Sequence, residues 1–426
     1  MYIKPIDSNL KADNNLNLAF DIGKDKLDVY TEVDQNSIQN SFNNKTLTIE
    51  KELTRLHEIA ISKGYEGLRI IAEPTGVYHK KLFRTARKMG HKTAIVNPES
   101  VYKFKVIESN DAGKTDSKDC RVIFLLAKYN KTLIDRNLIK GYAALRNLNT
   151  HYIEQEKVYV SLRCKIFNLL KELFCDYSFS SKFLYTNSGR QLVKRFKANP
   201  YRIIKYGYAH FYKRMKKYAP RMRNSTIQRL WQDAKVSSRH QLDPEYVKVL
   251  EFQFISLWED LATVEKRKEI IENKMIKTYE SLREFDPYLP DSVKGFITKF
   301  RIAQLLAETG PLSDFASTNQ LMRYAGLNIR ERKSGKFKGQ NKISKKGRAN
   351  LRRVLGYIVL PLVKKKALLG SRYHRKKDAG MPGTKAMVPM MRKVLSIFYG
   401  WYKSGQPFDM DRIFLDESQY KKLKEN

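Results

Sequence analysis

Cysteine, long apolar runs and acidic residues are all scarce in this sequence of 426 residues, and each scarcity narrows the class of protein. The three cysteines, Cys120, Cys164 and Cys175, have spacings that match no disulfide framework or metal motif, so we expect ordinary packing in a reducing compartment. No apolar run approaches the roughly 20 residues that cross a bilayer, and the N-terminus lacks the apolar core of a signal peptide. These absences predict a soluble cytoplasmic protein with no membrane span.

The shortage of acidic residues leaves a large positive charge. The chain has 82 Lys and Arg against 44 Asp and Glu, a formal net charge of +38. A polyanion best relieves the repulsion among so many like charges, so nucleic acid is the first candidate partner and an anionic membrane surface the second. A solvated basic surface without a partner is the remaining alternative. Residues 1–136 hold 23 basic and 18 acidic residues, so most of the excess lies downstream.

The length and the apolar content describe a folded protein of several domains. A chain of 426 residues is too long for one ordinary core, which favours two or three domains. Hydrophobic residues make up 42% and aromatic residues 12%, values typical of globular proteins. We therefore predict three parts: 1–136, 137–285 and 286–426.

The first part alternates between strand-like and helix-like segments. Strands are expected at 17–23, 27–33, 67–73 and 91–97, and helices at 47–63, at 77–89 and from Ser117, a plausible N-cap, onward. A turn at Gly23–Asp25 would join the first two strands as a hairpin. This order indicates an α/β domain around a mixed sheet.

The middle part is predicted to be an antiparallel coiled coil. Residues 142–176 and 245–284 have helical periodicity and contain neither Gly nor Pro. Between them, 177–243 contains 16 Lys and Arg, two acids and 12 aromatic residues. Interleaved basic and aromatic residues suit backbone contact and base stacking, as in proteins that bind RNA or single strands. The alternative is a small helical insert with an aromatic core and a basic surface.

The last part is expected to be mostly helical. Helices are predicted at 293–308, 318–325, 346–366 and 386–402. The Gly- and Lys-rich stretch 331–347 indicates a hairpin or loop. The fold class is thus α/β plus all-α.

Four carboxylates occupy positions that suit a metal site. Asp21 and Glu73 end apolar strands, and Asp116 and Asp119 lie three residues apart at the start of a helix, where they can share a face. Four converging carboxylates repel one another unless a divalent cation neutralises them, and oxygen-only ligands select Mg²⁺ or Mn²⁺. Such ions stabilise the attacking and leaving oxygens of a phosphodiester displacement.

Taken singly, each of these acids has another explanation. Asp21 in DIG also fits the phosphate-binding start of actin-like ATPases, and Asp116 or Asp119 can cap a helix. We assign the nearby Asp25, Asp28 and Asp111 to turns and to the solvated face of the hairpin. The ordered set of strand Asp, strand Glu and helix Asp pair is the layout of a ribonuclease H-like nuclease core.

Longer motifs make the resemblance specific. Four stretches resemble the DEDD motif region of the transposases of one family of bacterial insertion sequences: FDIGKDKLDV, AEPTGVY, IVNPES and NDAGKTDSKDC. Its first domain resembles the Holliday-junction resolvase RuvC, and the resemblance places the four acids on Asp21, Glu73, Asp116 and Asp119. The later stretches FASTNQLMRYAGLNIRERKSGKFKGQNKISKKGRANLRRVL and MMRKVLSIFYGWYKSGQPFD resemble the family's second domain.

The resemblance also implies a nucleophile. A serine in the SG element of that second domain falls on Ser334, whose neighbour Gly335 lets a phosphate approach closely. Ser344 is the competing serine, and its position before KKGRANLRR fits an N-cap. The basic residues expected to hold DNA phosphates are Lys333, Lys336, Lys338 and Arg348.

The family implies partners as well as chemistry. Its members act on donor and target double-stranded DNA, use a noncoding bridge RNA as a guide, and form tetramers in which carboxylates and serine come from different protomers. The resemblance therefore implies a homo-oligomer, from dimer to tetramer, that associates with the nucleoid. A hydrolytic RuvC-like junction nuclease and an inactive nucleic-acid-binding protein remain the alternatives. The insert 177–243 has no counterpart in typical members, and DPYLPDSVKGFITKF replaces the helix-hairpin-helix signature.

Overall fold

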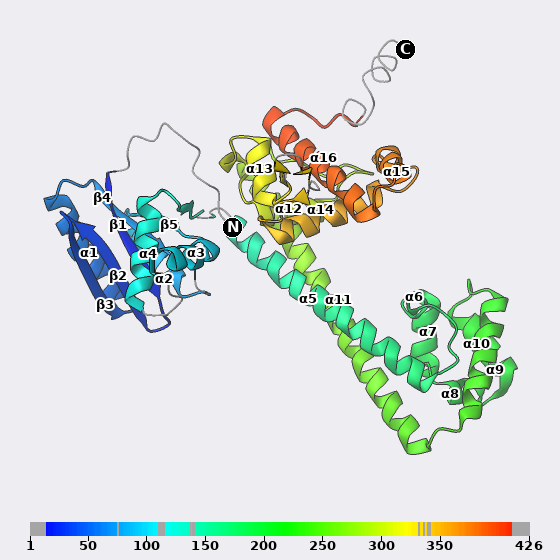
Figure 1. The fold of residues 1–426 in the computed structure, drawn as a ribbon. Coiled ribbons are helices and arrows are strands. Elements are labelled where there is room, and N and C mark those ends of the chain that lie inside the picture. The colour runs from blue at the N-terminus through cyan, green and yellow to red at the C-terminus, as the bar shows by residue number, and fades with distance from the viewer. Residues whose placement is uncertain are drawn as a thin grey trace, which may run out of the picture. The chain divides into compact units, whose positions relative to one another are not determined.

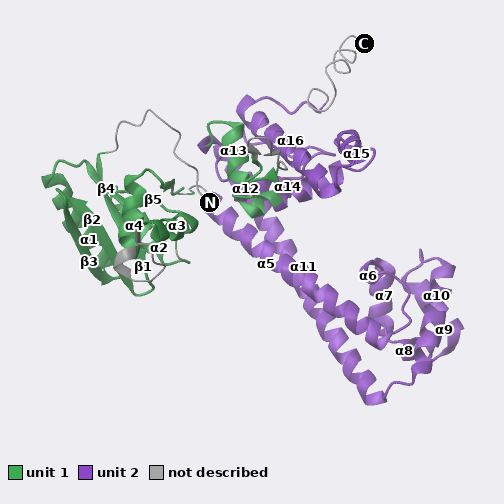
Figure 2. Ribbon diagram, in the orientation of Figure 1, with its two compact units in different colours: residues 1–138, 315–352 green, residues 139–314, 353–426 purple. Residues whose placement is uncertain are grey.

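The computed structural model describes most of the chain (Figure 1). The described residues are 14–74, 76–109, 116–136, 138, 141–330, 333–334, 337–338 and 342–410, without the side chains of 108–109, 116–118, 134, 333–334 and 337–338. They divide into two compact units, coloured separately in Figure 2. Unit 1 comprises 1–138 and 315–352, and unit 2 comprises 139–314 and 353–426.

The first segment of unit 1 is an α/β domain, as the sequence predicts. Its strands are β1 (Asn15–Ile22), β2 (Lys26–Val33), β3 (Asn36–Asn43), β4 (Gly67–Ala72), β5 (Lys92–Ile95) and β6 (Leu133–Ile134), and its helices are α1 (Thr46–Ser62), α2 (His79–Lys88), α3 (Pro98–Ser109) and α4 (Asp116–Lys128). The six strands form one sheet in the order β3-β2-β1-β4-β5-β6. Strands β1, β4 and β5 run parallel to one another, and β2, β3 and β6 pair antiparallel with their neighbours.

The sheet separates two apolar layers. Leu18 and Phe20 of β1 pack with residues of α1 and α2 on one face. Ala19, together with Ile71 of β4, packs with residues of α4 on the other. Successive side chains of a strand point to opposite faces, so both faces of β1 are covered at Leu18, Ala19 and Phe20, which are fully buried. This burial explains why the central strands are predictable from sequence.

Three elements of this domain are not predicted by the sequence: strand β3, helix α3 and the two-residue strand β6. Strand β3 pairs with β2 along its whole length, but its sequence, NSIQNSFN, is polar and largely exposed. The ladder of backbone hydrogen bonds orders this edge strand, and Ile38 and Phe42 pack on the core of the domain, so few of its residues need to be apolar. Helix α3 begins at Pro98, a residue that fits the first turn of a helix because it has no N–H to leave unpaired.

Unit 2 is built around a pair of long antiparallel helices, α5 (Tyr142–Leu173) and α11 (Pro244–Phe285). Near one end Gly141 lies against Leu282, in the middle the Gln155 carboxamide accepts a hydrogen bond from Arg267 at 3.2 Å, and Glu156 pairs with Lys268. Figure 1 shows the two helices side by side along their length. The predicted antiparallel pairing of these segments is what the structure shows.

The insert between α5 and α11 is a helical subdomain. Its elements are α6 (Ser181–Leu184), α7 (Asn187–Phe196), α8 (Pro200–Ile204), α9 (Gly207–Tyr218), α10 (Asn224–Ser237) and the short 3₁₀ helix η1 (Ser238–His240). They share an aromatic and aliphatic core with the adjoining ends of α5 and α11. Tyr177, Phe196 and Phe211 are buried in this core, whereas Tyr206 and Tyr208 are exposed. Much of the aromatic content therefore belongs to the core.

Helix α12 (Lys299–Thr309) packs on the α5–α11 pair through a buried polar network. The Asn149 amide donates to Glu308 Oε1 at 2.7 Å, and Gln304 Nε2 donates to Asn149 Oδ1 at 3.0 Å. All three side chains are almost fully buried. Buried polar groups are costly unless they are paired, so this network selects one register of α12 against α5.

The remaining C-terminal elements lie in both units. Unit 1 contains helix α13 (Thr318–Ala325) and the strands β7 (Ile329–Arg330), β8 (Lys333–Ser334), β9 (Phe337–Lys338) and β10 (Lys342–Ile343). Helix α14 (Ala349–Leu362) spans the boundary between the units. Unit 2 contains the helices α15 (Gly370–Asp378) and α16 (Gly383–Ser404). The compact units therefore do not follow the three-part division by sequence, because 315–352 groups with the α/β domain. Within the described residues no helix has both the length and the apolar character of a membrane span.

Candidate functional site

Asp21 and Glu73 lie at the ends of neighbouring parallel strands. The register of β1 and β4 aligns Phe20 with Ala72, and the next residue in each segment is an acid, Asp21 after β1 Phe20 and Glu73 after β4 Ala72. Ala19 and Ile71, two residues earlier, face the apolar layer of α4. Because side chains alternate along a strand, Asp21 and Glu73 point to that same side of the sheet. Parallel pairing thus brings together two carboxylates that are far apart in sequence.

Helix α4 brings a third carboxylate to this edge. Cys120 is buried, and its Sγ accepts a hydrogen bond from the Asp21 N–H at 3.2 Å and donates to the Asp28 carbonyl at 3.3 Å. Burial, followed by the nearby carboxylates, raises the pKa of Cys120 to about 12, so it stays a neutral thiol. This thiol ties the first turns of α4 to β1 and β2 and fixes the adjacent Asp119. We expected only ordinary packing for Cys120, and the hydrogen bonds are an addition.

The charges of these acids affect one another. Burial raises the pKa of Glu73 above its ordinary value, and the charges of Asp21 and Asp119 raise it further, while Lys105 lowers it. Lys105, on α3, pairs with Asp119 and is mostly buried. The sequence analysis missed Lys105, because a lysine in a helix resembles a surface residue. Its ammonium supplies one positive charge to a group of at least three carboxylates.

The other predicted acids fall in different places. Asp25 is exposed in the β1–β2 turn, as expected. Asp28 was assigned to the solvated face of the hairpin, but that is wrong: it stands directly opposite Asp21 in the ladder, is only 17% exposed, and pairs with Lys26 at 3.3 Å. Asp111 lies outside the described residues. The proposed N-cap, Ser117, is also wrong, because α4 already includes Asp116.

The donor set fits a hard divalent cation. Asp21, Glu73 and Asp119 offer carboxylate oxygens, which Mg²⁺ and Mn²⁺ prefer. The backbone of α4 carries Asp116 one turn before Asp119, but the side chain of Asp116 lies outside those that the structure describes. Like charges held this close, partly out of water, raise a carboxyl pKa, and a bound cation would reverse that effect. These residues are therefore the ones that could hold a metal.

Ser334 lies in a pair of nested hairpins. Strand β7 pairs with β10, and within that pair β8 pairs with β9, with Ser334 opposite Phe337. The predicted hairpin in 331–347 is confirmed for the described strands. The side chains of Ser334, Lys333 and Lys338, and all of Lys336, lie outside the described part, so the structure does not place them relative to the carboxylates.

Two glycines hold the base of this hairpin against α13. A Cβ added at Gly347 would lie 2.1 Å from the Gly326 nitrogen, and Gly326 itself has φ +67°. Only glycine permits so close an approach of two backbones. Arg352 donates to the carbonyls of Ala325 at 2.9 Å and Gly347 at 3.0 Å, across the same contact. The base of the Ser334 hairpin is thus fixed by backbone packing.

The remaining predicted residues of this segment have structural contacts. Ser344 is not the N-cap of α14, which begins at Ala349. Its amide donates to the Asn328 carbonyl at 2.9 Å and its hydroxyl to Asn328 Oδ1 at 2.5 Å, which closes the hairpin. The Arg348 amide donates to the Tyr324 carbonyl at 2.8 Å, and its side chain is half-buried. A phosphate-binding role for Arg348 stays a prediction.

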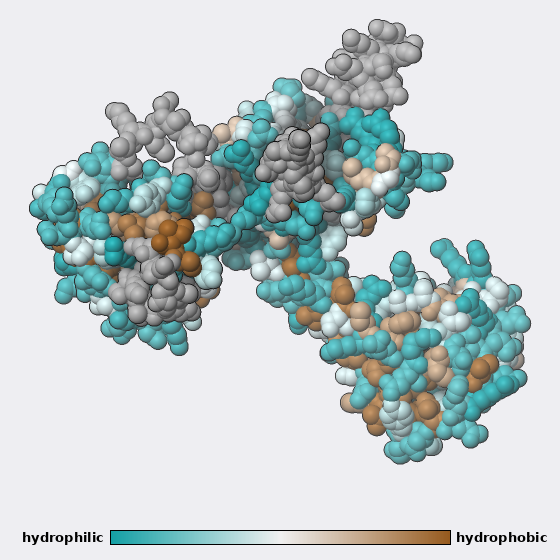
Figure 3. Space-filling view, viewed as in Figure 1, coloured by the Kyte–Doolittle hydropathy of each residue, from teal (hydrophilic) through white to brown (hydrophobic). Residues whose placement is uncertain are grey.

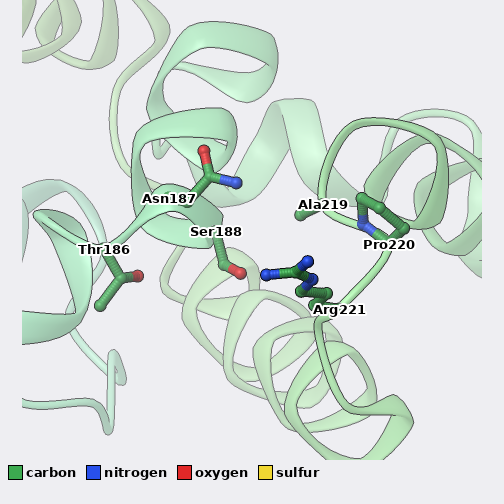
Figure 4. Close-up of a pocket in the computed structure, with 6 residues that line it drawn as sticks. All are labelled: Thr186, Asn187, Ser188, Ala219, Pro220 and Arg221. Atoms are coloured by element: carbon green, nitrogen blue, oxygen red, sulfur yellow. The ribbon is translucent and has the colours of Figure 1, made fainter.

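A pocket in the insert is a separate feature. It has a volume of about 380 Å³ and is lined by Thr186, Asn187, Ser188, Ala219, Pro220 and Arg221. In Figure 4 the Ser188 hydroxyl and the Arg221 guanidinium point toward one another. Among the six lining residues there is no carboxylate, His or Cys, so this pocket offers no general acid or base.

Comparison with known proteins identifies the class. Residues 18–175 match a family of DEDD transposases of the IS110 type, which is described as Transposase. Residues 292–374 match a second family, which is described as Transposase IS116/IS110/IS902 family. No curated protein matches the chain. The two matches define the chain as a DNA transposase, an enzyme of DNA recombination. More narrowly, it belongs to the DEDD transposase family of insertion sequences. The insert 177–243 lies between the two matched segments.

Proposed function

We propose that this transposase cuts and rejoins DNA with a RuvC-like carboxylate site and Ser334 as nucleophile. The observation that carries the proposal is that Asp21 and Glu73 end neighbouring parallel strands and face helix α4, which carries Asp119 and is bonded to β1 through Cys120. The strand order β3-β2-β1-β4-β5, with β1, β4 and β5 parallel, supports a ribonuclease H-like core. We propose Asp116 as the fourth acid and Mg²⁺ or Mn²⁺ as the cofactor.

The residues would act in two transfers. A bound divalent cation supplies charge stabilisation at the phosphate. Asp21, Glu73, Asp116 and Asp119 hold it, and Lys333, Lys336, Lys338 and Arg348 hold neighbouring phosphates. Ser334 Oγ gives its proton to solvent and forms a bond to phosphorus while the bond to the 3′ oxygen breaks. The 3′ oxygen takes up a proton, which leaves a phosphoserine and a free 3′-hydroxyl. That hydroxyl then attacks the phosphoserine of a second duplex, and the serine oxygen leaves and regains a proton.

The family membership supports a proposal for the partners and the assembly. We propose that donor and target duplexes are the substrates, that a noncoding bridge RNA selects them, and that the enzyme works as a dimer or tetramer in the cytoplasm, at the nucleoid. The net charge of +38 supports simultaneous contact with RNA and two duplexes, because each neutralised phosphate releases counterions. As functional parts we retain 1–136 for the carboxylates, 137–285 for the coiled coil with its insert, and 286–426 for the serine.

A strand-exchange assay tests this function against its alternatives. Purified protein is incubated with Mg²⁺, RNA transcribed from the DNA that flanks the gene, and labelled donor and target duplexes. We expect recombinant joints without net hydrolysis, and their loss when Mg²⁺ is chelated. Hydrolysed ends with no joints would favour the junction nuclease. Binding without any strand cleavage would favour an inactive nucleic-acid-binding protein.

The insert offers a second nucleic-acid contact. Helix α9 carries His210, Lys213 and Lys217 at helical spacing, and Tyr206 directly precedes the helix. All four are exposed, opposite the buried Phe211 and Met215. The Tyr206 and His210 rings lie 5.1 Å apart. Figure 3 shows mainly hydrophilic side chains over the insert. We propose that this stripe binds the backbone and bases of RNA or a displaced single strand.

Removal of two charges from this stripe is expected to weaken RNA binding. In the double variant Lys213→Ala/Lys217→Ala, the slope of log affinity against log salt for single-stranded RNA should become shallower by about 1.4, because two phosphate contacts are lost. The matched control is Lys274→Ala/Lys277→Ala, which removes the same charge from exposed positions of α11. Equal slopes for the two double variants would show that the stripe makes no specific contact.

A further inference from the structure

Three metal-ligating side chains converge where the insert joins the coiled coil. Cys175 and Asp176 follow the end of α5, and His240 ends η1, four residues before α11 begins. Their ligand atoms all lie within 4.8 Å of one another. The Asp176 Oδ2 atom is 3.3 Å from both Cys175 Sγ and His240 Nε2. This group is distinct from the carboxylate site of the α/β domain.

We propose that Cys175, Asp176 and His240 form a Zn²⁺ site that holds the two ends of the insert together. Thiolate, imidazole and carboxylate are the ligands that zinc takes in proteins, whereas Mg²⁺ takes oxygen ligands. In a tetrahedral zinc site, bonds of about 2.0–2.3 Å place neighbouring ligand atoms about 3.3–3.8 Å apart. The two separations of 3.3 Å match this spacing before any metal is bound.

The ligands are held in place by the core on both sides. Cys175 and Asp176 form a turn between Phe174 and Tyr177, whose side chains are both fully buried. Lys171, the nearest cation on α5, donates to the carbonyls of Cys175 at 3.3 Å and Tyr177 at 2.8 Å, which fixes the turn. Because the turn is already ordered, little conformational entropy is lost when the ligands engage a metal.

The second segment is fixed by a buried serine. Ser237 lies at the end of α10, accepts a hydrogen bond from the Asp176 amide at 2.9 Å and donates to Asp176 Oδ2 at 3.1 Å. Such a hydrogen bond orients a ligating carboxylate. The Cys175 thiol donates a hydrogen bond to Asp176 and holds the pKa of that carboxyl below its ordinary value. The Ser237 hydroxyl and the charge of His240 lower this pKa as well.

Zinc binding would replace the present hydrogen bonds with coordination bonds. The Cys175 thiol gives its proton to solvent as the zinc–sulfur bond forms, and the imidazole binds as the neutral ring. Three protein ligands leave a fourth position open, and the exposed side of the site, where His240 is 57% exposed, admits a water there. The metal would link residue 175 to residue 240, so the insert between them would become a loop closed by a metal cross-link.

Cobalt provides a direct probe of this site in the full-length protein. Co²⁺ replaces Zn²⁺ in tetrahedral sites, and a cobalt–thiolate bond adds a charge-transfer absorption that carboxylate ligands do not produce. We expect metal-free protein to bind one equivalent of Co²⁺ with this absorption, and Zn²⁺ to displace it. The absorption should vanish in Cys175→Ser and persist in Cys164→Ser, which replaces an exposed cysteine of α5. The readout does not depend on DNA cleavage, so its failure would leave the proposed transposase mechanism untouched.

A second variant tests the remote ligand. His240 is exposed, so His240→Gln should fold as the wild type does, which far-ultraviolet circular dichroism checks. Its Co²⁺ affinity should fall by about tenfold or more, since changes even to groups that support a ligand have effects of that size. Each of three results would overturn the proposal. They are a wild-type protein without the thiolate absorption, an absorption that persists in Cys175→Ser, and a Co²⁺ affinity that is unchanged in His240→Gln.

Discussion

Glu73→Gln is expected to lower Mg²⁺-dependent DNA strand cleavage by about 10³-fold or more while DNA binding is retained. Metal coordination contributes several kcal/mol to the stabilisation of a phosphoryl transition state, and 1.4 kcal/mol corresponds to a factor of ten. Glutamine keeps the size of the side chain but removes the charge that a cation requires. Cleavage of a labelled duplex, measured as a single-turnover rate, gives the comparison.

The fold of this variant should be intact. Burial and the charges of Asp21 and Asp119 raise the pKa of Glu73, so the apo protein already disfavours a charge at this position, and a neutral isostere relieves the repulsion. Glu66→Gln is the matched control, because Glu66 is an exposed acid at the opposite end of β4. Equal cleavage by Glu73→Gln and Glu66→Gln would contradict a catalytic role for the carboxylate edge.

Gly347→Ala is expected to unfold the base of the Ser334 hairpin. The added Cβ would lie 2.1 Å from the Gly326 nitrogen and 2.5 Å from the Ala325 carbonyl carbon, and backbone atoms cannot move aside as a flexible side chain can. Overpacking of this severity costs about 3 kcal/mol. Hydrogen exchange of the Ser344 and Arg348 amides, which bond to Asn328 and Tyr324, should accelerate by about a hundredfold.

A second glycine provides the control for this effect. Gly356 lies within α14, and a Cβ there meets nothing within 4 Å. Alanine has the higher helix propensity, so Gly356→Ala should stabilise the protein by about 1 kcal/mol. If Gly347→Ala leaves the exchange of both amides at the wild-type rate, the contact between the two glycines does not hold the hairpin.

The sequence predicts those elements of the fold in which burial determines where the apolar residues must stand. Strand β1 is buried on both faces at Leu18, Ala19 and Phe20, which form a short apolar run. The long helices α5 and α11 must each cover a core along their length, which imposes helical periodicity. Strand β3 has a weaker requirement, since the ladder with β2 orders it and only Ile38 and Phe42 pack on the core, so its mostly polar sequence gives little signal.

The candidate site was predictable to the same degree. Asp21 and Glu73 stand out because each is an acid next to buried apolar residues at the end of a strand. Lys105 gave no signal, because its importance comes only from the packing of α3 beside Asp119. The group at Cys175 and His240 was equally hidden, since the whole insert separates its members in sequence. Contacts between distant segments are what a single sequence does not reveal.

The most direct test of the proposed mechanism is to look for the covalent intermediate. Protein, guide RNA and a labelled donor duplex are mixed with Mg²⁺, denatured, and digested so that any peptide that carries a nucleotide can be sequenced by mass spectrometry. We predict an adduct on Ser334 that disappears in Ser334→Ala and in Glu73→Gln but persists in Ser344→Ala, the neighbouring serine that the structure assigns to hairpin closure. Strand cleavage that continues in Ser334→Ala, with no protein–DNA adduct in any sample, would contradict the account.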